Sequence, residues 1–279
     1  MNPQYSLVHL TNAACPPPEM IRIAAKAGYD CVSLRSIPTR MKVNNAAVNT
    51  SVTGQMPFDL ARNHSLFLAT KQAAREEGIC IHDTENARIF DGVDVRDYEG
   101  DLETAAELGI GDILTNIWTE DSEFYEDAFA RLCELAASYG LHVNLEFVTW
   151  SGVKDLRAAA TLLSRTGCPN AGIVVDTLHF YRSGNIPEEL EGLRSEWFRY
   201  VHLCDCPKKI PTDPEELIRT GLANRLFPGE GSAGIRSILS KIPHVVRGIE
   251  VPNPARMDSL GYEAYARLAL ETTRQYLDP

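Results

Sequence analysis

The chain has 279 residues, of which 44% are hydrophobic and 23% charged, and a formal net charge of −11. This acidic balance, without a basic run, disfavours a nonspecific nucleic-acid surface or an anionic-membrane surface. No stretch approaches the roughly 18 apolar residues of a membrane span, and the N-terminus lacks the segments of a signal peptide. We therefore expect a cytoplasmic protein with small-molecule partners, no nucleic acid and no membrane, and we leave a homo-oligomer open.

The seven cysteines are an odd number and are scattered along the chain. Cys204 and Cys206 form a C-x-C pair, but no second pair lies at zinc-finger spacing. The pattern favours free thiols in a reducing compartment over a disulfide framework or a cysteine-based zinc site.

Short apolar runs alternate with amphipathic stretches along the whole chain. The runs predict strands over 5–10, 29–34, 78–84, 112–118, 141–147, 171–176, 200–205 and 245–251. The amphipathic patterns predict helices over 18–28, 59–78, 96–109, 122–140, 153–167, 233–242 and about 259–276. Strands that are apolar throughout are typical of parallel strands covered on both faces.

Four glycines, Gly28, Gly78, Gly109 and Gly140, stand between a predicted helix and the next strand, where a left-handed helix end is expected. Eight alternating β/α units over this length predict a (β/α)8 TIM barrel, with residues 1–279 as a single domain. An open doubly wound sheet is the alternative.

Two connections, 39–57 and 206–228, are long and follow predicted strands 2 and 7. In a barrel they would lie at the face that carries the site, as lids or pocket walls, although their sequence does not specify a role.

Four of the apolar runs in the second half end in a carboxylate or an imidazole: Glu146, Asp176, His202 and Glu250. Strand alternation allows all four side chains to point into one barrel mouth. Burying three carboxylates together is costly unless a cation compensates them, so the pattern predicts a divalent metal site. The competing interpretation is that these residues are turn formers or helix N-caps, and for Asp176 alone it is equally well supported.

In these residues and their spacing the chain resembles the xylose-isomerase-like barrels. That family includes sugar epimerases and isomerases, inosose dehydratases and apurinic-site endonucleases. The resemblance covers essentially the whole chain and is carried by Glu146, D-x-x-H at Asp176 and His179, H-x-x-D at His202 and Asp205, R-x-x-P-G-E-G from Arg225 to Gly231, and Glu250.

The resemblance implies that Glu146, Asp176, His202 and Glu250 bind one divalent metal. It also implies that the two glutamates exchange protons with the substrate, that His179 contacts the substrate or a further metal, and that Arg225 holds a substrate oxygen.

An oxygen-rich set of this kind favours Mn²⁺, Co²⁺ or Mg²⁺, with Zn²⁺ left open. Such an ion polarises a carbonyl, so that a carboxylate can remove the neighbouring proton and form an enediolate. We expect an isomerase or epimerase of a small non-phosphorylated sugar or keto-polyol. A metal-dependent dehydratase of the inosose or dehydroshikimate type is the main alternative, and a non-catalytic barrel is less favoured.

The segment 229–234 matches G-x-G-x-x-G, which imitates a dinucleotide fingerprint. However, the preceding residues do not form a strand, and Glu230 would face a pyrophosphate unfavourably. We expect a tight turn before a helix instead, with Glu230 at the N-terminal end of that helix or near the metal.

In the family that the chain resembles, the DNA-repair endonucleases use further histidine ligands. Strand 4 ends in Asn116-Ile117-Trp118 and the loop after strand 7 has no histidine, which leaves His82 as an isolated candidate. The remaining substrate-pocket candidates each stand at or just past a strand end: His9, Arg35, Glu85, Arg88, Trp118 and Trp150.

Overall fold

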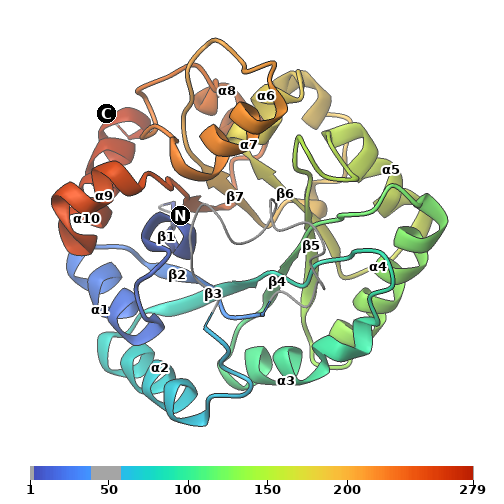
Figure 1. Ribbon diagram of the computed structural model, residues 1–279, viewed down its shortest axis with the longest axis horizontal. Coiled ribbons are helices and arrows are strands. Elements are labelled where there is room, and N and C mark those ends of the chain that lie inside the picture. Colours follow the sequence, from blue (N-terminus) through green and yellow to red (C-terminus); the bar gives the residue numbers. More distant parts are fainter. Residues whose placement is uncertain (1–2, 39–57, 279) are drawn as a thin grey trace.

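The computed structural model describes residues 3–38 and 58–278. In these ranges eight parallel strands pair in chain order and close into a barrel, with β1 against β8 (Figure 1). The strands are β1 Tyr5–Val8, β2 Cys31–Arg35, β3 Cys80–Glu85, β4 Asp112–Thr115, β5 His142–Glu146, β6 Ala171–Asp176, β7 Tyr200–Leu203 and β8 Val246–Ile249. The predicted TIM barrel is confirmed, and the open sheet is excluded because β1 and β8 are hydrogen-bonded neighbours.

The helices form a ring outside the barrel (Figure 1). The α-helices of the described residues are α1 Pro17–Ala27, α2 His64–Glu77, α3 Glu99–Glu107, α4 Ser122–Ala137, α5 Leu156–Thr166, α6 Thr177–Arg182, α7 Pro214–Ala223, α8 Ile235–Lys241, α9 Pro254–Leu260 and α10 Tyr262–Leu277. Short 3-10 turns cover His9–Asn12, Val95–Tyr98, Pro187–Leu190 and Ser195–Trp197.

Strand alternation separates two apolar layers. Val175, Val201 and Ile249 belong to the large core between barrel and helices. Val174 and Tyr200 belong to a small cluster with Leu114 inside the barrel. The predicted face of strands 6 and 7 is therefore confirmed, because the interior residues share their face with Asp176 and His202.

The glycines that precede strands behave as predicted. Gly28, Gly78, Gly109 and Gly140 have φ of 90°, 67°, 76° and 72°, a conformation that only glycine adopts without strain. Gly28 and Gly78 are the C-cap residues themselves, whereas Gly109 and Gly140 follow the caps of α3 and α4.

Several predicted helix boundaries were wrong. The helix expected from 59 begins at His64, after Asn63, whose side chain caps it. The helix expected over about 259–276 is α10, which begins at Tyr262, because Gly261 at φ 77° separates it from α9, a short helix that was not predicted. Helices α6 and α7 were not predicted, although Asp213 followed by Pro214 is a strong helix-start signal.

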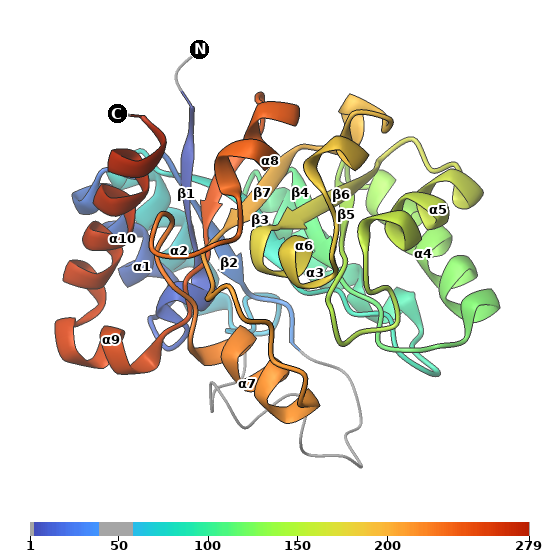
Figure 2. The same cartoon turned by 90° about the horizontal axis from the view of Figure 1, so that it is seen from above.

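Helix α7 lies in the connection after β7, at the end of the barrel opposite the N-terminus (Figure 2). Asp205 and Leu226 form an antiparallel bridge that closes the base of this connection. The other long connection, 39–57, lies outside the described residues. Among the described helices none is long and apolar enough to cross a membrane.

Candidate metal centre

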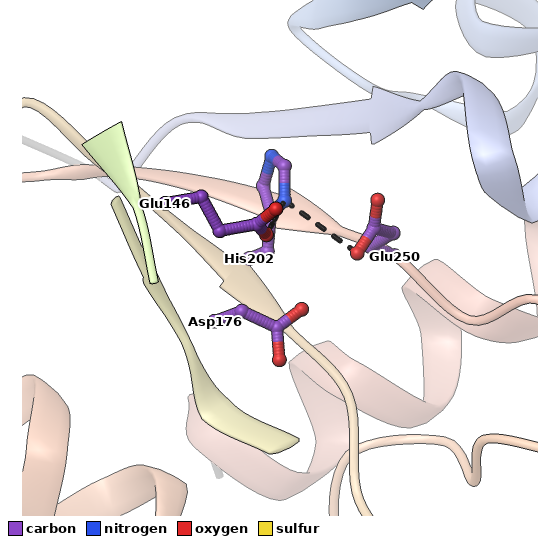
Figure 3. A group of neighbouring side chains, drawn as sticks. All are labelled: Glu146, Asp176, His202 and Glu250. Carbon is purple, nitrogen blue, oxygen red and sulfur yellow. Dashed lines mark ion pairs between the residues drawn. The ribbon is translucent and has the colours of Figure 1, made fainter. Parts of the chain in front are cut away.

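The side chains predicted as ligands come from four consecutive strands. Glu146 and Asp176 are the last residues of β5 and β6, His202 is the third residue of β7, and Glu250 directly follows β8. One ligand atom from each lies within 4.8 Å of the others (Figure 3). The four residues were far apart in sequence, and the parallel barrel brings their strand ends to one point.

The imidazole of His202 lies against two of the carboxylates of this cluster. Its Nδ1 atom lies 3.5 Å from Glu146 Oε1 and 3.5 Å from Glu250 Oε2. Gly248, its register partner on β8, makes room for the ring, because a Cβ at Gly248 would lie 3.1 Å from His202 Cδ2. No ring nitrogen of His202 has a hydrogen-bond partner among the described residues.

Among the residues that the structure describes, one buried arginine, Arg225, pairs with these carboxylates and compensates part of their negative charge. The Nη1 atom of Arg225 lies 2.5 Å from Asp176 Oδ2 and 2.7 Å from Glu250 Oε2. The three carboxylates carry a charge of −3 and this guanidinium carries +1. The cluster therefore has a net charge of −2 when His202 is neutral. That deficit equals the charge of one divalent cation.

The charges of the cluster shift the pKa values of its own residues. Burial alone would lower the pKa of His202, but the negative charges of Glu250 and Glu146 raise it well above its usual value. Burial would raise the pKa of Glu250, but Arg225 and His202 hold it well below its usual range. Burial raises the pKa of Glu146. Without another cation, the cluster therefore gains positive charge by holding a proton on His202.

The donor set fits a divalent metal. Three carboxylates and one imidazole are all buried, lie within reach of a single ion, and include a ring nitrogen that no hydrogen bond satisfies. Glu146, Asp176, His202 and Glu250 would hold the ion.

Asp176 is a helix N-cap and also faces the predicted metal cluster. Its Oδ1 accepts hydrogen bonds from the backbone N–H groups of Leu178 (2.8 Å) and His179 (3.0 Å), which caps α6. Its Oδ2 faces Arg225 and the cluster. The cap fixes the carboxylate so that one oxygen remains directed at the site.

Asn116 was not predicted as a site residue, yet it orients Glu146. Its Nδ2 donates a 2.7 Å hydrogen bond to Glu146 Oε2, and its Oδ1 accepts from Asn86. Its position just after β4 was the available signal, because β4 neighbours β5 in the barrel.

A pocket opens beside the cluster. The predicted pocket residues that line it together with Glu146 and Glu250 are Arg35, Glu85, Arg88, Trp118, Trp150, His179 and Arg225. Further lining residues are Leu10, Asn86, Asn116, Val148 and Leu222.

His179 lies on α6, with its ring edge-to-face against Trp150 at a centroid distance of 4.8 Å. Its Nδ1 lies 2.9 Å from Thr149 Oγ1. Burial lowers the pKa of His179 to about 4, so the ring is neutral near pH 7. A neutral ring can donate or accept a hydrogen bond without adding charge to the pocket.

His9 does not line this pocket. Its Nδ1 accepts from the backbone N–H of Arg35 at 2.9 Å, and its Nε2 lies 2.9 Å from the Cys15 carbonyl oxygen. The ring also stacks on Phe58. Because backbone groups use both nitrogens, we no longer include His9 among the substrate-binding residues.

The P-G-E-G segment is anchored by Asp205, whose carboxylate accepts from the backbone N–H groups of Cys206, Gly229 and Ala233. A Cβ at Gly231 would lie 2.3 Å from the Cys206 carbonyl oxygen, so only glycine fits there. The segment forms the predicted turn, and the buried carboxylate of Asp205 stabilises it through these hydrogen bonds.

Glu230 was expected at the start of a helix or near the metal, and it lies at neither place. It accepts from the Phe227 backbone N–H and pairs with Arg256 at 2.7 Å on the surface. Gly234 is the N-cap of α8, so the turn precedes that helix as predicted.

Helix α7 forms one wall of the pocket region. A Cβ at Gly221 would lie 2.4 Å from Trp150 Cη2, so this glycine lets the helix approach the indole closely. Leu222, the next residue of the helix, lines the pocket. The connection 206–228 thus contributes a wall to the site, whereas the role expected for 39–57 concerns residues that are not described.

Comparison with known proteins gives a consistent family assignment. A family model described as "Xylose isomerase-like TIM barrel" matches residues 21–275. An inosose isomerase of Halalkalibacterium halodurans is 24% identical over 159 residues, which cover 52% of this chain and 53% of that protein. An inosose isomerase of Bacillus subtilis is 23% identical over 198 residues, which cover 65% and 66%. The matches thus span about half to two thirds of the length of these relatives.

Among solved structures, the crystal structure of the protein IOLI with a bound zinc atom has a TM-score of 0.73. The two chains are 18% identical, and the match covers 99% of this chain and 100% of that one. At this identity the likeness establishes the fold.

Proposed function

The chain belongs to the xylose isomerase-like TIM-barrel family, and on that premise we propose that it is a divalent-metal-dependent isomerase or epimerase of a small, non-phosphorylated sugar or keto-polyol. The observation that carries the proposal is the buried cluster of Glu146, Asp176, His202 and Glu250, whose charge with Arg225 falls short of neutrality by two. The sequence similarity to inosose isomerases supports the same class of reaction.

In this proposal the two glutamates move the proton. Their carboxylates come from β5 and from the end of β8, and both lie 3.5 Å from Nδ1 of His202 (Figure 3). When bound, the metal supplies Lewis-acid polarisation of the substrate carbonyl. One glutamate removes the neighbouring proton to form an enediolate and later loses that proton to solvent. The other glutamate takes a proton from solvent and delivers it to the opposite face of the carbon, which inverts it.

The surrounding residues hold these groups in place. Asn116 fixes one oxygen of Glu146, and Arg225 fixes one oxygen of Glu250. The walls formed by Trp118, Trp150 and Leu222 limit the access of water to the reacting carbon. We propose Glu85, Trp118, His179 and Arg225 as substrate contacts.

The ion is proposed as Mn²⁺, Co²⁺ or Mg²⁺, because carboxylates dominate the donor set; Zn²⁺ is the competing identity. Metal analysis of the purified protein before and after chelation, with thermal stability measured alongside, tests this part. We expect about one equivalent of metal per chain and a lower melting temperature after chelation. A metal-free protein that neither rebinds metal nor changes its melting temperature would contradict the proposal.

We also make two further proposals: first, that residues 1–279 form one domain, and second, that the protein is located in the reducing cytoplasm. Pairing of β1 with β8 joins the two ends of the chain in one barrel, which supports the first part. The free thiols of all seven cysteines support the second.

Turnover is tested by solvent exchange. The metal-loaded protein is incubated with a panel of keto-polyols in deuterated water, and we expect deuterium at the carbon next to the carbonyl. Glu146→Gln keeps the size of the side chain and should lower the exchange rate by about 10²-fold or more.

Normal exchange by a Glu146→Gln variant that still binds metal and substrate would show that the proton-transfer role is wrong. If net loss of water and an ultraviolet-absorbing enone product accompany exchange, the activity is that of a dehydratase.

A further inference from the structure

Two cysteines stand side by side at the amino end of the barrel, whereas the metal cluster lies at the carboxyl end. Cys31 is the first residue of β2 and Cys80 is the first residue of β3, and the two are register partners in the parallel sheet. The next pair in register, Val32 and Ile81, faces the large core between barrel and helices. Strand alternation therefore directs both cysteines to the inner face of the sheet.

The backbone places the two thiols within reach of each other. Neighbouring strands lie about 4.8 Å apart, and cysteines joined by a disulfide have Cα atoms about 4.4–6.8 Å apart. Both thiols are free, and their side chains are hydrogen-bonded to each other. Cys31 is 1% exposed, whereas Cys80 is exposed to solvent. A small oxidant can therefore reach Cys80, with the buried thiol of Cys31 beside it.

The surroundings activate Cys80 rather than Cys31. The hydrogen bond from Cys31, and then the positive charge of His82, lower the pKa of Cys80 to about 7. They outweigh burial and the carboxylates of Asp83 and Asp112, which act in the opposite direction. The hydrogen bond with Cys80, burial and the charge of Cys80 raise the pKa of Cys31 well above its usual value. Near neutral pH a large share of Cys80 is thus the reactive thiolate, while Cys31 keeps its proton.

We propose that Cys31 and Cys80 form an oxidation site that reacts with a hydroperoxide, such as hydrogen peroxide, and closes to a reversible disulfide between β2 and β3. An exposed thiolate next to a second thiol is the arrangement of peroxide-sensing cysteines. Neither cysteine takes part in the proposed proton transfer, so the site is independent of the proposed function.

The reaction has two steps. The Cys80 thiolate attacks one oxygen of the peroxide, the O–O bond breaks, and the leaving hydroxide takes a proton from solvent to become water. Cys80 is then a sulfenic acid. Cys31 loses its proton and attacks the sulfur of Cys80, the S–O bond breaks, and the leaving hydroxide takes that proton to form a second water. Two electrons thus pass from the two thiols to one peroxide.

The first step also prepares the second. Once Cys80 carries oxygen, its negative charge no longer raises the pKa of Cys31, so the buried thiol can ionise. Exposed disulfides are the readily reduced ones, so the thiols of a reducing compartment restore the pair after the oxidant has gone.

The test detects the disulfide directly. The reduced protein is treated with hydrogen peroxide near neutral pH, the remaining thiols are blocked with N-ethylmaleimide, and the unreduced peptides are analysed by mass spectrometry. We expect a peptide pair linked through Cys31 and Cys80, which disappears when dithiothreitol is added before blocking. Cys80→Ser, at an exposed position, should remove the linkage without disturbing the fold.

The second cysteine with a lowered pKa provides the matched control. The hydrogen bond from Cys133 lowers the pKa of the partly exposed Cys168 to about 7. Cys168→Ser therefore removes a thiol of similar acidity elsewhere in the chain, and the linkage between Cys31 and Cys80 should form to the same extent as in the unchanged protein.

Two variants of Cys31 separate its roles. Cys31→Ser keeps a hydrogen-bond donor but cannot form the disulfide, so oxidation should stop at a Cys80 sulfenic acid that dimedone traps. Cys31→Ala removes the donor as well and should slow the alkylation of Cys80 by N-ethylmaleimide about threefold or more relative to Cys31→Ser, because less thiolate is present. Circular dichroism verifies folding, and Cys80→Ser carries the test if the Cys31 variants do not fold.

Oxidation of Cys80 in the unchanged protein without linkage to Cys31 would overturn the inference. So would a linkage between the Cys80 residues of two chains, which appears as a dimer on a non-reducing gel. Equal alkylation rates in Cys31→Ser and Cys31→Ala would overturn the activation of Cys80 by Cys31. A linked peptide pair in a protein that shows no solvent exchange supports the oxidation site and contradicts only the proposed function.

Discussion

Two buried polar clusters lie inside the same barrel, and they balance their charges differently. The amino-end cluster consists of Ser33, His82, Asp83, Asp112, Asn144 and Arg199. The carboxyl-end cluster consists of Glu146, Asp176, His202, Arg225 and Glu250. Both combine residues of neighbouring parallel strands with one arginine from outside the strands, and both contain aspartates that are at most 3% exposed.

The amino-end cluster satisfies its charges within the chain. Arg199 binds both oxygens of Asp112, and Asn144 donates to the same carboxylate at 3.0 Å. Asp83 accepts from Ser33 at 2.5 Å, and its other oxygen lies 3.3 Å from His82 Nδ1. Two carboxylates thus face one arginine and one histidine.

The carboxyl-end cluster does not balance its charges within the described residues. Its three carboxylates face one arginine and one histidine, so counted in the same way it has one more negative charge than the described residues balance. Uncompensated buried charge costs stability, so a protein keeps it only where a ligand supplies the balance. The contrast teaches that burial of carboxylates alone does not mark a site, whereas a charge deficit does.

The largest expected effect comes from removing one charge in each cluster. Asp176→Asn keeps an oxygen for capping α6, because asparagine is as good an N-cap as aspartate. It should weaken metal binding by about 100-fold or more, since it replaces an anionic ligand. Titration with Mn²⁺ measures this loss.

Asp112→Asn is the matched change in the amino-end cluster. It should leave metal affinity unchanged and lower the free energy of unfolding by about 1–3 kcal/mol, because Arg199 loses its charged partner. If both variants changed the metal affinity equally, the claim that only the carboxyl-end cluster binds metal would be wrong.

Metal binding should depend on pH through the carboxyl-end cluster. The raised pKa of His202 reflects a proton that the metal must displace. Affinity should therefore weaken as pH falls and strengthen as pH rises toward the raised pKa, by up to about tenfold per pH unit for one proton. Titrations between about pH 5.5 and about pH 8 measure this slope, because these limits lie about one unit below and about one and a half units above the ordinary histidine pKa.

The control for this prediction is His82→Gln. Asp83 raises the pKa of His82 against the effect of burial, so the native His82 stabilises the fold below its unfolded pKa and this contribution is lost as pH rises through the raised value. The variant should change the pH dependence of unfolding but not that of metal affinity. If the metal affinity did not depend on pH, metal binding would not displace a proton from His202, and the prediction would be wrong.

The smallest effect is expected at the amides. Asn116→Ala removes the hydrogen bond to Glu146 Oε2 and should lower kcat by about five- to tenfold with the fold intact, because the glutamate loses its orientation. Asn144→Ala removes the hydrogen bond to Asp112 and should lower thermal stability instead. Steady-state kinetics and melting curves of the two variants distinguish positioning for catalysis from support of the fold.

The sequence by itself determined the barrel and the four ligand candidates. Apolar strands of the right number, glycine helix ends and carboxylates at strand ends are local patterns, and a parallel barrel translates strand ends into spatial neighbours. The same patterns placed Glu85, Trp118, His179 and Arg225 at the pocket.

Only the tertiary structure decided which of these groups are compensated and by what. Whether His9 faces a substrate or the backbone, whether Glu230 approaches the metal, and whether Asn116 reaches Glu146 depend on contacts between strands and loops distant in sequence. The pairing of Arg225 with Asp176 crosses 49 positions of the chain. Charge balance is a sum over three-dimensional neighbours, and no local sequence pattern contains that sum.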